Sequence, residues 1–277
     1  MKLLTRGVVV LLALVVVAIG AIWFSLGHIV RKAVETEGTK SLRLATTLDS
    51  ATVSLIRGKL GLHRLAIASP QGFSAPHMLE AGEIGVDVRY GELRKQPIHV
   101  RALTIDKPKL VIEQSGGALT FRKAMELLPE SDPNKPPMKL VIDLLDVKDA
   151  QVVVRPSLPG LAHEITVPVP ALALKDIGHG KGADNGAAIK EVAMQVIGAL
   201  AAKAAESDGV PGELKALLHL NVGQLAGQLG GEAARNIASA LPGDLGKKLP
   251  ANPADLTKDP GKALQGLLPA GRRGPRR

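Results

Sequence analysis

The chain has 277 residues, a net charge of +9 and no cysteine. Without cysteine, disulfides, thiolate metal sites and thiol catalysis are excluded. The positive charge is typical of nucleic-acid binding, but it is dispersed, and aromatic residues that stack on bases make up only 2% of the chain. We therefore expect no nucleic-acid partner.

An uncharged apolar run opens the chain, from Gly7 to Val30. A transmembrane helix needs about 20 such residues, so the run predicts a single N-terminal transmembrane anchor over residues 1–31. A cleavable signal peptide ending near Ala18-Ile19-Gly20 is the alternative, although the sequence stays apolar to Phe24. Because the bulk of the chain follows the run, we expect the body to be exported. Val30–Ser41 is predicted to continue as a polar helix.

Residues 32–177 are predicted to form a curved antiparallel β-meander. Apolar side chains alternate with polar ones, as at Ile84, Val86 and Val88, and turn residues separate the alternating segments. The segment Leu119–Glu130 interrupts this pattern and predicts one short helix between strands.

A weak internal repeat runs through this region: Leu65–Pro70 recurs as Leu103–Pro108 and, more loosely, as Leu144–Ala150. Repeats of this kind extend a sheet one hairpin at a time, but hairpin proteins also show such echoes by chance. Both interpretations stay open.

Residues 178–243 are predicted to be helical. Two Ala-rich amphipathic segments, 187–209 and 212–243, follow a Gly-rich break, and in the first Ile189 and Val196 lie on one helical face. The last segment, residues 244–277, is rich in Pro, Gly and Lys and is expected to be a flexible, disordered tail. It ends in four arginines that would either contact lipid headgroups or simply keep the tail solvated: Arg272, Arg273, Arg276 and Arg277.

No motif carries catalytic chemistry. Gly178-x-Gly180-x-x-Ala183 matches a relaxed dinucleotide fingerprint, but no strand follows the next helix, as that fold requires. The seven histidines show no metal-ligand spacing, and no nucleophile elbow is present. We expect a non-enzymatic protein with no catalytic residues, no cofactor and no metal site.

Two segments resemble the N-terminal region of AsmA-like proteins. Ile67–Phe73 matches the turn "I-x-N/S-P-x-G-F", and Leu103–Leu110 matches the hairpin "L-x-I-x-x-P-x-L". The chain is thus similar to a small member of that family. The resemblance implies a bacterial inner-membrane protein with its body in the periplasm and a β-sheet groove, with phospholipid transport or outer-membrane homeostasis as its role.

An aliphatic groove suits acyl chains, because each buried CH₂ contributes about 0.8 kcal/mol. These candidate groove residues would otherwise form an ordinary core beneath the C-terminal helices. They are Leu55, Leu60, Leu62, Ile84, Val86, Val88, Ile98, Val100, Ile105, Leu110 and Ile112.

The main expectation is therefore a lipid-binding protein anchored in the inner membrane, with the bilayer, phospholipid cargo and envelope proteins as partners. The alternative is an interaction scaffold that binds a protein and carries no lipid. A groove predicts a continuous exposed apolar strip, whereas a scaffold predicts a polar concave face with its apolar stripe on the helices. A periplasmic hydrolase, the third possibility, would need paired titratable residues in one cleft.

Overall fold

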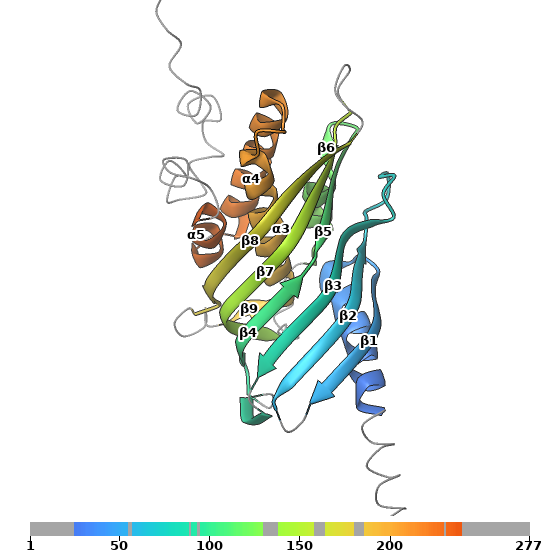
Figure 1. The fold of residues 1–277 in the computed structure, drawn as a ribbon, viewed down its shortest axis with the longest axis vertical. Coiled ribbons are helices and arrows are strands. Elements are labelled where there is room, and N and C mark those ends of the chain that lie inside the picture. The colour runs from blue at the N-terminus through green and yellow to red at the C-terminus, as the bar shows by residue number, and fades with distance from the viewer. Residues whose placement is uncertain are drawn as a thin grey trace, which may run out of the picture.

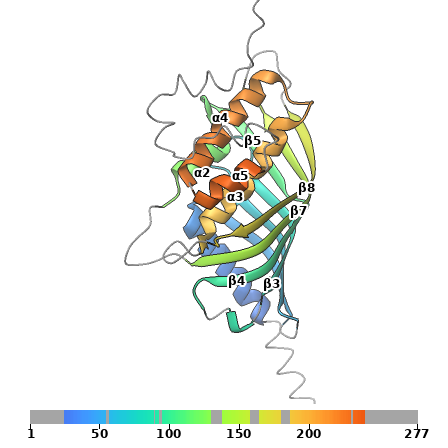
Figure 2. The ribbon, with the colours of Figure 1, turned by 90° about the vertical axis from the view of Figure 1, so that its left-hand side faces the viewer.

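The computed structural model describes residues 25–54, 57–88, 90–92, 95–129, 138–157, 164–179, 186–229 and 231–239. These residues form a mixed β-sheet with helices packed against one of its faces (Figure 1). Figure 2 shows the sheet curving around the helices. In the described part of the chain, no helix lies over the opposite face, which we call the open face. The predicted α+β class is confirmed.

The first half of the sheet follows the predicted meander. β1 (Thr46–Ser54), β2 (Lys59–Ala68) and β3 (His77–Val88) pair antiparallel in chain order. The short 3₁₀ helix η1 (Tyr90–Glu92) leads towards β4 (Ile98–Asp106), which pairs antiparallel with β3. Alternation of apolar and polar residues predicted these strands, because each has one buried and one solvated face.

The second half of the sheet departs from the meander. β4 and β5 (Lys109–Ser115) both pair in parallel with β7 (Lys139–Arg155). β8 (Ile165–Ile177) then pairs antiparallel with β7. The expectation of an all-antiparallel meander is therefore wrong, because the chain crosses over between β5 and β7 instead of turning back in a hairpin.

β4 and β5 act as two halves of one long strand. Asp106 lies opposite Lys148 and Lys109 opposite Gln151, so both halves keep the same register against β7. Two short strands complete the sheet: β6 (Ala118–Leu119) pairs with β5, and β9 (Ala187–Ala188) pairs with β7.

The helices lie close to their predicted positions. Residues 25–42 are helical, α2 (Thr120–Glu126) follows β6, and α3 (Ile189–Glu206) follows β9. The second Ala-rich segment forms two helices, α4 (Gly212–Leu229) and α5 (Gly231–Ser239). No helix among the described residues is long and apolar enough to cross a membrane. The expected anchor lies outside them except for residues 25–31, and the expected disordered tail lies wholly outside them.

One continuous core joins the helices to the covered face of the sheet. Leu110 and Leu145 on the sheet pack in the same cluster as Leu200 of α3 and Leu218 of α4, all of them fully buried. Phe121 is the largest of the fully buried side chains. Leu, Val, Ile and Ala therefore form most of the core, in keeping with the 2% aromatic content of the chain.

A crease crosses the middle of the sheet. Arg64 on β2, Lys107 between β4 and β5, and Asp149 on β7 have left-handed φ values of 53°, 49° and 51°. The flanking pairs place Lys107 opposite Asp149 and place Arg64 opposite Gly82 on β3. At the crease the alternation changes phase: along β7 the side chains in the main core are at 145 and 147 before it and at 150, 152 and 154 after it, while Val153 is buried in a separate small cluster. The crease keeps apolar side chains on the covered face as the sheet bends.

Candidate functional site

The candidate groove residues line the covered face of the sheet. Leu110 and Ile112 are 0% exposed, so no ligand reaches them while the helices are in place. Others in the buried core are Leu62, Ile84, Val100 and Ile105, and Val88 is buried as well. Only Leu60, Val86 and Ile98 are half-buried at the margin of the core. Leu55 lies outside the described residues, as do the four tail arginines.

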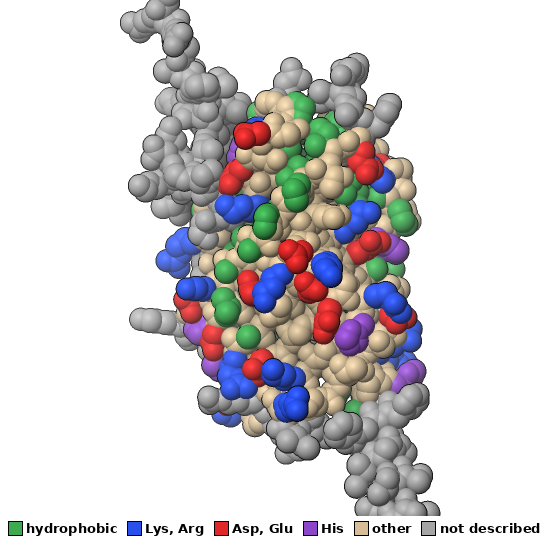
Figure 3. Space-filling model, viewed as in Figure 1, with side chains coloured by type: hydrophobic (Ala, Val, Ile, Leu, Met, Phe, Trp, Pro, Cys, Tyr) green, Lys and Arg blue, Asp and Glu red, His purple; other side chains and the backbone are tan. Residues whose placement is uncertain are grey.

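The open face is polar. Figure 3 shows acidic and basic side chains gathered over the middle of this face, with hydrophobic side chains scattered around them. Several of the charged groups form ion pairs between neighbouring strands, such as Arg64 with Asp49 and Arg101 with Asp87. A polar face of this kind does not offer the continuous exposed apolar strip that an acyl-chain groove requires. The concave face of the sheet is the apolar one that the helices cover, so the polar concave face expected of a scaffold is not found among the described residues either.

A hollow of about 860 Å³ lies beside the helix of residues 25–42, over β1 to β4. Its floor includes four residues that lie side by side across β1, β2, β3 and β4, each paired with the next. They are Thr52, Gly61, Gly85 and Thr104. Because none of the four has a large side chain, the sheet backbone forms much of the floor.

The two glycines of this row differ in the space around them. A Cβ on Gly85 would meet nothing nearer than the Thr104 Cβ, at 4.0 Å, whereas a Cβ on Gly61 would lie 2.6 Å from Thr52 Oγ1. A side chain at position 85 would therefore project into the hollow without a clash. The rim of the hollow carries both charges, with Arg31 and Lys59 as cations and Glu83 and Asp87 as anions.

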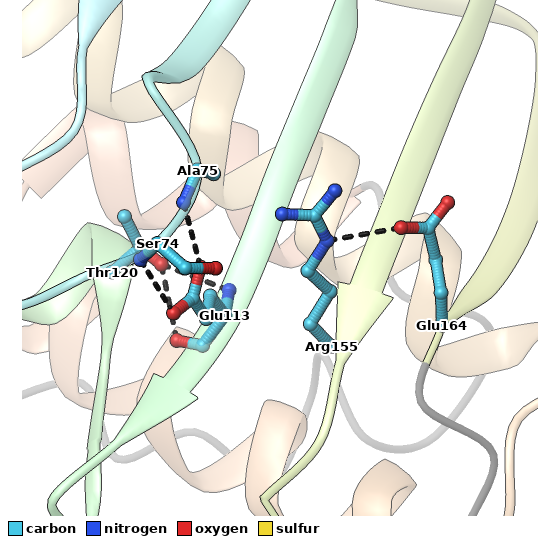
Figure 4. A network of polar contacts seen from close by, with 6 residues as sticks. All are labelled: Ser74, Ala75, Glu113, Thr120, Arg155 and Glu164. Carbon is cyan, nitrogen blue, oxygen red and sulfur yellow. Dashed lines mark hydrogen bonds and ion pairs between the residues drawn. The ribbon is translucent and has the colours of Figure 1, made fainter.

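A buried carboxylate, Glu113 on β5, fastens the β2–β3 connection to the sheet (Figure 4). It accepts hydrogen bonds from the backbone N–H groups of Ser74 and Ala75, at 2.7 and 3.0 Å, and from the Ser74 hydroxyl at 2.9 Å. Its backbone N–H donates to Thr120 Oγ1. Burial raises the pKa of Glu113, but the three hydrogen bonds and the charge of Arg155 lower it below its ordinary value. This network positions a loop and does not form a cleft with paired titratable groups.

Three titratable side chains meet on the open face, at the end of β7 far from Glu113. They are His99 on β4, Asp143 on β7 and His179 just after β8. Asp143 Oδ1 lies 2.6 Å from His99 Nε2 and 3.1 Å from His179 Nε2. The two imidazole rings are 6.2 Å apart and meet edge to face. The hydrogen bond from His99 is the main cause that keeps the pKa of Asp143 below its ordinary value.

Sequence reasoning treated each histidine as isolated, which is wrong for His99 and His179. The three residues are far apart in the chain, and only the parallel pairing of β4 with β7 brings the first two together. The Gly-rich break contributes Gly178, whose φ of 77° turns the chain just before His179. Gly180 and Ala183 of the rejected dinucleotide fingerprint lie outside the described residues.

Comparisons with models of protein families, with curated proteins and with solved structures gave no match.

Proposed function

We propose that this chain is a non-enzymatic interaction protein of the bacterial envelope, anchored in the inner membrane by its N-terminal run, with its body in the periplasm. It would present the open face of its sheet to a protein partner. In this proposal the chain is a small AsmA-like protein in which helices occupy the position of the lipid groove.

The observation that carries the proposal is the occupancy of the apolar face. The protein's own helices bury Leu110, Ile112 and Val152 completely. An acyl chain would have to displace α3 to reach them, and that would expose the core that joins α3 to α4. Protein partners, by contrast, bind surfaces that mix polar and charged groups, where complementary charges determine orientation and specificity.

The chemistry of the hollow favours an extended polar segment of a protein as the occupant. The free space over Gly85 allows close approach to the backbone, and the hydroxyls of Thr52 and Thr104 can donate and accept hydrogen bonds. Charges of both signs on the rim suit a segment that itself carries both signs.

The position of the helix of residues 25–42 agrees with an anchor before it. This helix lies along β1, and the apolar run precedes it in the chain. As a helix, residues 7–24 would be about 27 Å long at 1.5 Å per residue, close to the thickness of the hydrocarbon core. The hollow borders the start of the described helix, at Gly27 and His28, and would therefore face the membrane side of the body.

Lipid binding is the second candidate, and one observation favours it. Val53, Leu60, Val86 and Leu103 form a register row on the covered face, and all four are only half-buried. Three of the four, Val53, Leu60 and Val86, also line the hollow beside the start of the helix of residues 25–42. The row would hold part of an acyl chain without displacing α3.

A photo-cross-linking experiment on the full-length protein in native membranes tests the proposal. With the photoreactive residue at Thr104, we expect a discrete protein adduct that is lost when Gly85→Trp fills the hollow. The matched control places the same residue at Leu220, an exposed position on α4, whose products should not change with Gly85→Trp.

Native mass spectrometry with lipid extraction tests the second candidate function, lipid binding. The proposal predicts that Val86→Asp leaves the amount of bound phospholipid unchanged, because lipid contacts only the anchor. Loss of phospholipid in a folded Val86→Asp variant, together with no adduct from position 104, would support the lipid-binding function instead.

A further inference from the structure

We propose that His99, Asp143 and His179 form a binding site for one divalent transition-metal ion, with Zn²⁺ as the best fit. The site is separate from the hollow and does not depend on the proposed function. It takes its ligands from three elements: β4, β7 and the segment just after β8.

The spacing of the three ligand atoms is close to that of a coordination shell. With metal–ligand bonds of 2.0–2.1 Å, two ligand atoms of a tetrahedral site lie about 3.3 Å apart. The two contacts of Asp143 Oδ1, at 2.6 and 3.1 Å, approach that spacing, and all three ligand atoms lie within 4.8 Å of one another. Small rotations of the two imidazole rings would admit an ion.

The donor set selects the class of ion. Two imidazole nitrogens and one carboxylate oxygen suit Zn²⁺ and the neighbouring divalent transition metals, whereas Ca²⁺ and Mg²⁺ prefer a shell of oxygens. Three protein ligands leave a fourth position for water. The side chains of His99, Asp143 and His179 are 41%, 42% and 38% exposed, so an ion has direct access from solvent.

The backbone holds the third ligand in place. Gly178 has a φ of 77°, and a Cβ there would lie 2.4 Å from the Leu140 carbonyl oxygen and 2.6 Å from the Ala187 nitrogen. The Gly178 carbonyl accepts a hydrogen bond from the Gly186 N–H at 2.7 Å. Residue 178 must therefore be glycine for the chain to pass this close to β7 and β9, and this path brings His179 over Asp143. A bound ion would link β8 to β4 and β7 at the point where the chain leaves the sheet for α3.

The test is calorimetric titration of ZnCl₂ into the untagged, chelator-treated full-length protein in detergent, with Co²⁺ absorption as a second measurement. We expect one ion per chain, a visible Co²⁺ spectrum with the intensity of a tetrahedral site, and a rise in Tm with Zn²⁺. His99→Ala and His179→Ala should each weaken binding about tenfold or more and abolish the Co²⁺ spectrum.

His77→Ala is the matched control. His77 Nδ1 also contacts a carboxylate, at 2.9 Å from Glu80 Oε1, but this pair is not part of the three-ligand group. The variant should bind Zn²⁺ like the wild type. His99→Gln, compared by circular dichroism and by Tm without metal, separates loss of a ligand from loss of the fold. The proposal is overturned if the wild type binds no ion, or if folded His99→Ala and His99→Gln bind as well as wild type; the three residues would then form a hydrogen-bonded cluster only.

Discussion

Glu35, on the helix of residues 25–42, accepts a hydrogen bond from the backbone N–H of Leu48 on β1, with Glu35 Oε1 3.0 Å from the nitrogen. One turn later, Thr39 Oγ1 accepts from the Thr46 N–H at 3.0 Å. These two side chains occupy donors that an edge strand would otherwise present to other chains. Exposed edges of this kind promote sheet-to-sheet aggregation, so the helix protects the sheet as well as leading towards the predicted anchor.

Glu35→Ala should destabilise the protein by about 1–2 kcal/mol, because it removes a charged acceptor from the Leu48 N–H. Chemical unfolding of the full-length protein in detergent measures this. Glu37→Ala is the matched control, since Glu37 pairs with Lys40 on the surface of the same helix at 3.8 Å, and such pairs contribute little. Equal effects of the two substitutions would show that Glu35 does not protect the edge of β1.

Stability should fall in acid partly through Glu113. Its pKa is lower in the folded protein than its ordinary value, so its contribution is fully present above the unfolded pKa and is lost as pH falls towards the folded pKa. Glu113→Gln should cost about 1–3 kcal/mol near pH 7, and the difference from wild type should shrink below about pH 5. Unfolding free energies measured across this range check the prediction.

Ser74→Ala serves as the control, because it removes the hydroxyl donor but keeps the two backbone donors to Glu113. Its cost should be smaller than that of Glu113→Gln and should show the same pH trend. A Glu113→Gln deficit that is constant from neutral to acid pH would contradict the role of the carboxylate charge.

The backbone conformation at the crease predicts that the same substitution costs different amounts of stability at two exposed lysines, Lys107 and Lys109. Lys107 has a φ of 49°, and a β-branched residue is strained in this conformation, so Lys107→Val should destabilise by about 1–2 kcal/mol. Lys109 lies in extended backbone on β5, so Lys109→Val should change stability by less than about 0.5 kcal/mol. Thermal unfolding compares the stability of the two variants. Equal stability would show that the backbone at position 107 changes its conformation at no cost in free energy.

Local patterns predicted the elements well. Alternation located the strands, and helical spacing located α2 and α3, because both patterns report which side chains face the core. Strand neighbours could not be predicted in this way. Leu103 lies beside Leu145 in the parallel pair β4–β7, so the second and third copies of the weak repeat are adjacent, one residue out of the register that the sequence suggested.

The functional residues were harder to predict, because their proximity depends on that pairing. Buried groove candidates such as Leu110 were correctly chosen as apolar-face residues, but alternation does not show whether helices or solvent cover that face. His99 and Asp143 have no fixed sequence spacing, so the cluster became visible only with the register of β7. A phase change in alternation, from Val147 to Ala150, was the one sequence signal of the crease.

The protein's own helices close the apolar face of the sheet while the polar face stays open, and cysteine labelling distinguishes the two faces. Because the chain has no cysteine, single substitutions give a clean background in the full-length protein in native membranes. We expect Gly85→Cys and Thr104→Cys to react rapidly with a maleimide, and Leu110→Cys and Ile112→Cys to react only after unfolding. Rapid labelling at positions 110 and 112 in the folded protein would show that the helices do not close the apolar face, and that this face is an open apolar groove.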